Sequence, residues 1–270
     1  MDIKDISLEK HGWETSSEPV TRALGLKTPT KAEMVKNMAL VRQFRAVRGA
    51  PPAWDWRNVN GKNFVTPIRD QKNCGSCVAH GTVASIEATN LFKKSTPGVN
   101  FDLSEAFLFS KGGSCANGWT FVPALNAART YGIPDEACWP YAVSADGTHL
   151  TGSACRDWIQ RVASKGAKIA GWTQIAGGDA GAKLWLSTNG PVVTGMQVYQ
   201  DLFSYHTGVY KHVVGNLAGG HCVCIVGYND PGMYWIVKNS WGTTWGESGF
   251  FRIGYDQAIG SSYGFFGVKF

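Results

Sequence analysis

The sequence has no long apolar run and no block of like charge. No stretch approaches the ~18 consecutive apolar residues of a membrane-spanning helix, and the first residues lack the apolar core of a signal peptide. Lysine and arginine are scattered along the chain, although the formal net charge is +6 and the pI is near 8.9. We therefore expect a mildly basic protein whose partners include neither a membrane nor a nucleic acid.

Internal repeats and low-complexity tracts are also absent, and the composition favours a folded core. Hydrophobic residues make up 44% of the 270 residues and aromatic residues 12%. That length allows one large domain or two packed lobes around a shared cleft. The seven cysteines are an odd number, which fits disulfides together with free thiols. We therefore expect a secreted or other extracytoplasmic protein, with its leader absent from this sequence.

A glycine- and proline-rich break at residues 49–52 separates an N-terminal segment, residues 1–49, from a body, residues 50–270. Thr30 and Glu33 have the spacing of a helix capping box. Apolar residues then recur at helical intervals, at Met34, Met38, Val41, Phe44 and Val47. An amphipathic helix before a proline-rich joint predicts an appendage that docks on another part of the protein.

The body changes from a helical pattern to a strand pattern midway. Helices are predicted at 77–94, 104–110 and 122–131. Beyond residue 190 the sequence has short β-rich runs bounded by Gly, Asn and Asp, at 191–194, 221–226, 234–237 and 250–253. A helical half followed by a β half indicates an α+β fold with two lobes and a cleft between them.

The most informative run extends from Gln71 to Cys77. A helical pattern begins at Cys77, so this thiol meets unpaired backbone N–H groups and the positive end of the helix dipole, which favour the thiolate. A thiolate is the reactive nucleophile, Gly75 lets a ligand approach the backbone, and Gln71 can offer an amide N–H to an oxyanion. Cys77 is therefore a candidate nucleophile.

The alternative for this run is a metal or redox pair formed by Cys74 and Cys77. A zinc site needs a second pair of cysteines, and Cys222 and Cys224 have the wrong spacing for one. A redox pair of the thioredoxin type needs a βαβ context, which the pattern does not provide. This alternative is possible but weaker.

The run from Gln71 to Cys77 resembles the active-site signature of the papain and cathepsin family of cysteine peptidases. The family's other hallmark residues are matched by His221, before an apolar strand, and by Asn239, in the run from Asn239 to Gly249. The resemblance extends from about residue 50 to the C-terminus. It implies a papain-like two-lobed α+β fold, with a helical left lobe, a β-barrel-like right lobe and the active-site cleft between them.

The resemblance also implies a mechanism that needs no metal or cofactor. Cys77 would attack the scissile carbonyl of a protein or peptide substrate, and His221 would protonate the leaving amine and then activate water. Asn239 would orient His221, with Trp241 shielding their hydrogen bond from water. Gln71 and the backbone N–H of Cys77 would form the oxyanion hole.

Further site residues follow from the same resemblance. The family has two glycines whose backbone binds extended substrate. Gly118 matches the first of them and Trp119 replaces the second, and the bulk of Trp119 puts those subsites in doubt. Gly195 and Cys222 would line the pocket for the substrate's second residue. The implied disulfides are Cys74–Cys115 and Cys138–Cys155, with Cys222 and Cys224 as buried small hydrophobic residues.

His80 is the main rival of His221, because it lies three residues after Cys77 on the same helix. A base on that helix would point into the packing beneath the nucleophile, so we interpret His80 as a buried polar substitute for the family's aromatic residue. The hydrophobic residue Val78 is a second departure, which affects packing or leaving-group subsites.

We hypothesise that residues 1–49 lie over the cleft as a short pro-segment or a lid, rather than as a strap on the back of a lobe. The function we predict is that of a monomeric cysteine endopeptidase. An exopeptidase, an inactive relative kept as a binding module, and a transferase that uses the same thioester are the alternatives.

Overall fold

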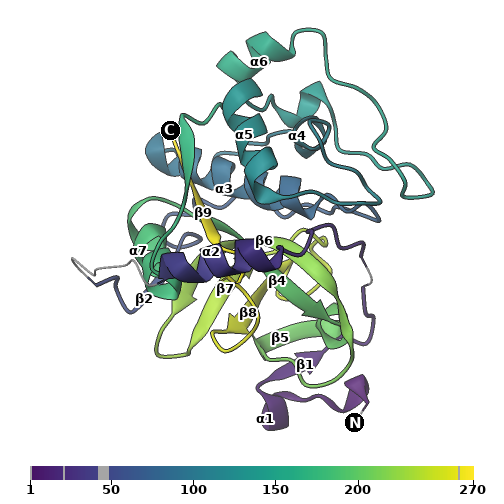
Figure 1. Cartoon of the computed structure of the whole chain (residues 1–270), viewed down its shortest axis with the longest axis vertical. Coiled ribbons are helices and arrows are strands. Elements are labelled where there is room, and N and C mark those ends of the chain that lie inside the picture. Colours follow the sequence, from purple (N-terminus) through teal and green to yellow (C-terminus); the bar gives the residue numbers. More distant parts are fainter. Residues whose placement is uncertain (1, 21, 42–48, 261) are drawn as a thin grey trace.

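The computed structural model describes residues 2–20, 22–41, 49–260 and 262–270. They form two lobes, one mainly helical and one mainly of strands, as the resemblance implies (Figure 1). The helices are α1 Leu8–His11, α2 Lys31–Val41, α3 Cys77–Lys93, α4 Glu105–Phe109, α5 Phe121–Tyr131, α6 Trp158–Ser164 and α7 Gly178–Thr188, with 3₁₀ turns at Ile3–Asp5, Glu136–Cys138 and Gln200–Ser204.

Helix α3 is the central element of the helical lobe, and all of its residues from Cys77 to Leu91 are buried. Small residues on this helix allow the strand lobe to approach closely. A Cβ on Gly81 would lie 2.7 Å from the Sγ of Cys222, for example. The neighbouring helix α4 is capped by Ser104, whose Oγ accepts the N–H of Phe107 at 3.0 Å. The helices predicted at 77–94, 104–110 and 122–131 are therefore confirmed.

The strand lobe is built on one sheet with the order β1-β5-β8-β7-β6-β4-β9-β3, and β2 pairs with β6. Within the described residues this sheet has two free ends and does not close, so "barrel-like" describes it only loosely. The strands are β1 Trp13–Thr15, β2 Ala53–Asp55, β3 Gly171–Gln174, β4 Val192–Tyr199, β5 Tyr205–Tyr210, β6 Leu217–Asn229, β7 Tyr234–Lys238, β8 Phe250–Gly254 and β9 Phe265–Lys269.

Two apolar clusters form the core, one in each lobe. The strand-lobe cluster is rich in aromatic rings, and Trp241, Trp245 and Phe251 form a series of edge contacts within it. None of the helices in the described ranges is long and apolar enough to cross a membrane. The cleft lies where α3 meets β4 and β6, so both lobes contribute side chains to it.

The beginning of the N-terminal segment is part of the strand lobe. Strand β1 pairs antiparallel with β5. Trp13, the first residue of β1, is fully buried among Tyr205 and Tyr210, and its Nε1 donates to the carbonyl of Lys211 at 2.9 Å. This segment is therefore attached to the body through both backbone and side-chain contacts.

Helix α2 begins as predicted, but its apolar stripe was predicted wrongly at Met38. The backbone N–H of Thr30 donates to the Glu33 carboxylate at 2.8 Å, and the N–H of Glu33 donates to Thr30 Oγ1 at 3.3 Å, which is a capping box. Met38 is 56% exposed. Asn37 is buried instead, because its Nδ2 donates to the carbonyl of Ser262 at 2.9 Å. Phe44 and Val47, from the same prediction, lie outside the described residues.

Candidate active site

Cys77 is the first residue of α3 and its side chain is completely buried. The N–H of Cys222 donates to its Sγ at 3.4 Å, and the N–H groups of Gly25 and Val78 also face the sulfur. These N–H groups favour the thiolate, but burial outweighs them and raises the pKa of Cys77 to about 11. The buried thiol of Cys77 therefore remains protonated.

His221 lies in the middle of β6, opposite Met196 of β4, and is fully buried. Its Nε2 donates to the Oδ1 of Asn239 at 2.8 Å. That oxygen also accepts the backbone N–H of Ser240 at 2.8 Å, which assigns the orientation of the amide. The ring of Trp241 lies 4.8 Å from the imidazole and covers this hydrogen bond.

The other nitrogen of His221, Nδ1, is buried and makes no hydrogen bond to any described residue. Burial lowers the pKa of His221 to about 4, although the hydrogen bond to Asn239 opposes this change. The covered site therefore holds a neutral imidazole at His221 and a neutral thiol at Cys77, whose sulfur contacts the backbone of the next residue, Cys222. A return of solvent would favour the charged form of both groups.

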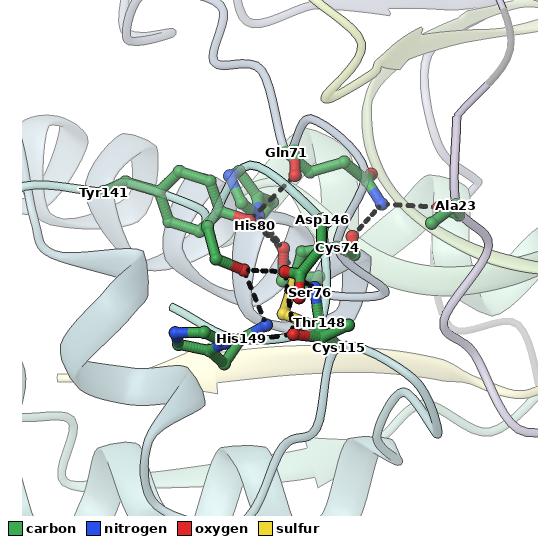
Figure 2. Close-up of a disulfide and its surroundings, with 11 residues drawn as sticks. Ala23, Gln71, Cys74, Ser76, His80, Cys115, Tyr141, Asp146, Thr148 and His149 are labelled. Carbon is green, nitrogen blue, oxygen red and sulfur yellow. Dashed lines mark hydrogen bonds between the residues drawn. A yellow bond between two sulfur atoms is a disulfide. The ribbon is translucent and has the colours of Figure 1, made fainter. Parts of the chain in front are cut away.

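Gln71 lies beside the nucleophile and is also completely buried. Its Nε2 donates to the carbonyl oxygens of Ala23, at 2.8 Å, and Cys74, at 3.0 Å (Figure 2). Its Oε1 accepts the hydroxyl of Ser240 at 2.7 Å, so the amide orientation is determined by contacts at both ends. The side chain is thus a fixed N–H donor aimed at a backbone carbonyl of the N-terminal segment.

That part of the N-terminal segment, residues 22–27, crosses the site between the two lobes, and we call it the cleft strap. The N–H of Leu26 donates to Gly220 of the strand lobe at 3.3 Å. On the helical side the N–H of Trp119 donates to the carbonyl of Gly25 at 2.8 Å, and the N–H of Lys27 donates to that of Trp119 at 3.3 Å. The strap therefore bonds to both walls through its backbone.

The strap passes so closely that glycine is required at its centre. A Cβ on Gly25 would lie 1.8 Å from the carbonyl oxygen of Gly75, and a Cβ on Gly118 would lie 1.8 Å from that of Gly25. Gly118 also has a φ of +65°, which L side chains rarely adopt. Gly75, Gly25 and Gly118 form a close-packed stack of backbone beside Cys77.

Trp119 does not obstruct the cleft, contrary to the doubt that its bulk raised. Its side chain is only 5% exposed and packs into the helical lobe against Phe109, with the ring centroids 6.2 Å apart. The backbone of Trp119 bonds to the strap at Gly25 and Lys27. The tryptophan side chain therefore leaves this backbone able to pair with an extended chain.

The other two predicted pocket residues lie in different surroundings. A Cβ on Gly195 would meet the side chains of Leu26 at 2.4 Å and Tyr263 at 2.5 Å, so Leu26 fills the space above this glycine. Cys222 faces α3 and packs against Gly81. Of the predicted set, Gly195 contacts the strap's apolar side chain, whereas Cys222 lines the interior beneath the nucleophile.

The disulfides match the pairing that the resemblance implies. Cys74 is bonded to Cys115 and Cys138 to Cys155, while Cys77, Cys222 and Cys224 are free and buried. The first disulfide holds the loop before Cys77 against the helical lobe (Figure 2). A C-x-x-C metal or redox pair is therefore wrong, because Cys74 is bonded elsewhere. The described residues contain no cluster of His, Cys, Asp and Glu that could hold a metal ion.

Two residues of the site were missed in the sequence analysis. The hydroxyl of Tyr141 donates to the carbonyl of Gln71 at 2.9 Å and lies 2.6 Å from Ser76 Oγ, which braces the loop before the nucleophile (Figure 2). Tyr263 forms a wall of the pocket that holds Leu26. Neither tyrosine lies in a recognisable motif, and each reaches the site from a distant loop.

The comparisons with known proteins identify the family of the chain. Residues 50–264 match the model of the papain family cysteine proteases. A cathepsin B-like CP3 of Giardia intestinalis is 34% identical over 217 residues, which cover 76% of this chain and 69% of that protein. Procathepsin L 3 of Tenebrio molitor larval midgut is 25% identical with a TM-score of 0.69, covering 88% of this chain and 79% of that one.

A stem bromelain precursor shares the fold over a longer range. Its TM-score is 0.71 at 21% identity, and the match covers 97% of this chain and 84% of the precursor. The likeness therefore includes much of the N-terminal segment as well as the body. The family match spans most of the chain, and the homologues are cysteine proteinases. This chain belongs to the papain family of cysteine proteases and is a cysteine peptidase.

Proposed function

We propose that the chain is an endopeptidase in which Cys77, His221 and Asn239 act together. The Cys77 thiolate attacks the carbonyl carbon of a peptide bond, the C–N bond breaks, and His221 gives its Nδ1 proton to the leaving amine. Water then attacks the thioester, His221 takes a proton from it, and the C–S bond breaks. The hydrogen bond from His221 Nε2 to Asn239 Oδ1 is the observation that carries this proposal, because it leaves Nδ1 free for the proton transfers.

Gln71 and the backbone N–H of Cys77 act as the oxyanion hole in this proposal. The amide of Gln71 is held at both ends, so its N–H needs no reorganisation when negative charge develops. In the covered site it donates to the carbonyl oxygen of Ala23. The Ala23 carbonyl oxygen of the strap therefore occupies the position in which the carbonyl oxygen of a substrate would be stabilised.

The N-terminal segment acts as a pro-segment that keeps the peptidase latent. The carbonyl oxygen of Ala23 accepts the side-chain N–H of Gln71, Gly25 lies against Gly75, and Leu26 fills the space beside Gly195. Burial under the strap also favours the neutral thiol and imidazole over the reactive ion pair. Removal of the strap exposes both groups to water while the N–H of Cys222 stays beside the sulfur.

Leu26 indicates which substrates the opened site accepts. It is only 6% exposed in a pocket bounded by Gly195 and Tyr263. The adjoining cavity of about 310 Å³ is lined on one side by Thr120, Phe121 and Phe266 and on the other by residues of the N-terminal segment itself, so it opens when that segment leaves. We propose a preference for a bulky apolar second residue in the substrate.

The two disulfides support an extracytoplasmic compartment, where such bonds persist. We propose that the protein works there as a monomer on protein or peptide substrates. The chemistry of Cys77 and His221 requires no metal or cofactor.

Labelling with an epoxysuccinyl peptide tests the proposal. The full chain and the same chain after removal of residues 1–49 are treated in parallel and mapped by peptide mass, with Cys77→Ala as the control. We expect rapid labelling of Cys77 alone in the processed form and slow labelling in the full chain. Failure of both forms to react would overturn the peptidase mechanism, and equal rates would overturn the role of the pro-segment.

A further inference from the structure

His80 has one nitrogen whose hydrogen-bond role is defined by its surroundings. It lies one turn after Cys77 on α3, is 4% exposed, and packs edge-on against Tyr141 (Figure 2). Its Nδ1 lies 3.1 Å from the carbonyl oxygen of Ser76, which can only accept, and 3.3 Å from Ser76 Oγ. The Tyr141 hydroxyl donates to Gln71, so the Ser76 hydroxyl, 2.6 Å from it, donates to Tyr141 and can only accept from Nδ1. Nδ1 therefore carries the hydrogen, and Nε2 is an acceptor. Burial lowers the pKa of His80 to about 4, which keeps the ring neutral.

Beneath the active site are two buried polar atoms with complementary roles. The acceptor Nε2 of His80 and the donor Nδ2 of Asn239 both lack a hydrogen-bond partner among the described residues. Nδ2 is the free end of the amide whose Oδ1 bonds to His221. A buried donor or acceptor that has no hydrogen-bond partner costs about 1–3 kcal/mol, so a partner for each atom would stabilise the structure.

Both residues line the same small cavity. Its volume is about 10 Å³, the scale of a single water molecule. Glu105 lines it as well, and its Oε2 is a third buried atom without a described partner. Burial and the nearby Glu87 and Glu136 raise the pKa of Glu105 well above its ordinary value, so its carboxyl is protonated and can donate.

We propose that one water molecule in this cavity joins His80 to Asn239, and that His80 is thereby a positioning residue for His221. The water accepts from Asn239 Nδ2 and from the Glu105 carboxyl, and it donates to His80 Nε2. Three partners are typical of a buried water. The inference depends on the proposed function, in which Asn239 orients His221.

The arrangement fixes the Asn239 amide at both ends. Its Oδ1 already accepts from His221 and from the N–H of Ser240. The water adds a contact at Nδ2, which resists rotation of the amide and of the imidazole bonded to it. Such outer contacts contribute through orientation, so their loss lowers the rate of turnover more than the affinity for substrate.

The bridge has its own pH dependence. Protonation turns Nε2 into a donor, so His80 no longer accepts from the water. The charged groups around it are Asp70, which favours protonation, and Arg69 and Lys238, which oppose it. Glu105, neutral when protonated, and Tyr141 face the same region. Since the bridge needs the neutral ring, protonation of His80 as the pH falls through about 4 breaks it.

The test compares His80→Phe and His80→Gln with the wild-type full chain. Phenylalanine keeps the ring and removes both nitrogens, whereas glutamine places an acceptor the same number of bonds from Cα as Nε2. After removal of residues 1–49 from the folded chain and titration of active sites with the epoxysuccinyl peptide, we expect His80→Phe to lower kcat about 3- to 10-fold with KM unchanged, the scale of one lost hydrogen bond. We expect His80→Gln to restore most of that loss.

A crystal structure of the wild-type full chain provides a readout independent of activity. We expect a water within hydrogen-bond distance of His80 Nε2 and Asn239 Nδ2, absent in His80→Phe. A missing water, an unchanged kcat in His80→Phe, or a His80→Gln variant as slow as His80→Phe would overturn the inference. If the activated wild type fails to label at all, the proposed function fails, while the presence or absence of the water still decides the bridge.

Discussion

The N-terminal segment contacts the body at two places, through strand β1 and through the cleft strap at residues 22–27. Strand β1 is held by a large buried side chain, since Trp13 is fully buried in the aromatic core of the strand lobe. The strap is held by backbone hydrogen bonds at Ala23, Gly25 and Leu26, by the smaller Leu26 side chain beside Gly195, and by the absence of a side chain at Gly25.

Strand β1 therefore attaches the segment to the body, whereas the strap is the part that covers the site. Burial of the apolar Trp13 side chain is non-directional and does not depend on exact contact geometry, so it keeps the segment on the body. The strap depends on close backbone contact, which a single added methyl group disrupts. We therefore expect the strap to leave the cleft more readily than β1 leaves the sheet. Three variants test this comparison.

Trp13→Ala should have the largest effect on the free energy of unfolding. Truncating a fully buried tryptophan typically costs about 3–5 kcal/mol, and this one also loses the hydrogen bond to Lys211. We expect a clear fall in the midpoint of thermal unfolding. Leu8→Ala is the control, because Leu8 is 46% exposed in the neighbouring α1 and should change stability little. Equal stability of the two variants would contradict the anchoring role of β1.

Gly25→Ala should open the cleft with a smaller effect on stability. The added Cβ would lie 1.8 Å from the carbonyl oxygen of Gly75, so the strap must shift. Overpacking typically costs about 1–3 kcal/mol, which corresponds to roughly a 5- to 150-fold faster labelling of Cys77 in the full chain. The labelling rate is measured with the epoxysuccinyl peptide.

Gly49→Ala is the matched control, because a Cβ on Gly49 would meet no atom within 4 Å. It lies in the same segment and should label as slowly as the wild type. If Gly25→Ala also labels slowly, the strap does not depend on the glycine stack, and the distinction between strap and anchor fails.

The proposed catalytic residues could be nominated from the sequence because they lie in compact local motifs. The run from Gln71 to Cys77 and the run from Asn239 to Gly249 carry their signal within a few residues. The helix that begins at Cys77 is strongly apolar and was predicted almost to its last residue. Short-range patterns of this kind survive without knowledge of the tertiary fold.

Other elements depend on tertiary contacts and could not be read in the same way. Strand β6 extends to Leu217–Asn229, well beyond its apolar run, because β4 pairs with Gly219 and Gly220 before the run and β7 pairs with Asn229 after it. Helix α6 has no buried residue, so it offers no apolar stripe to detect. The path of the strap is determined by contacts between residues far apart in the sequence, such as Leu26 with Gly220.

Arg22→Gln removes the weakest of the contacts that hold the strap on the body. Arg22 makes two hydrogen bonds of 3.1 Å to the Asp70 carboxylate, next to Gln71. Burial opposes ionisation of Asp70, but its contacts with Arg22 and Lys72 hold its pKa below the ordinary value of 3.8. Because the folded pKa is depressed, this stabilisation is present above about pH 3.8 and is lost as the pH falls through the lower, strap-bound pKa.

A partly exposed pair of this kind contributes about 0–1 kcal/mol. We therefore expect at most about a fivefold faster labelling of Cys77 in Arg22→Gln near neutral pH. Arg57→Gln, which breaks the Arg57–Asp55 pair away from the strap, should have no such effect. The rate is expressed relative to chain freed of residues 1–49 at the same pH, because that ratio cancels the titration of the thiol itself. A strap that loosens equally in acid with and without Arg22 would place its pH dependence on groups other than Asp70.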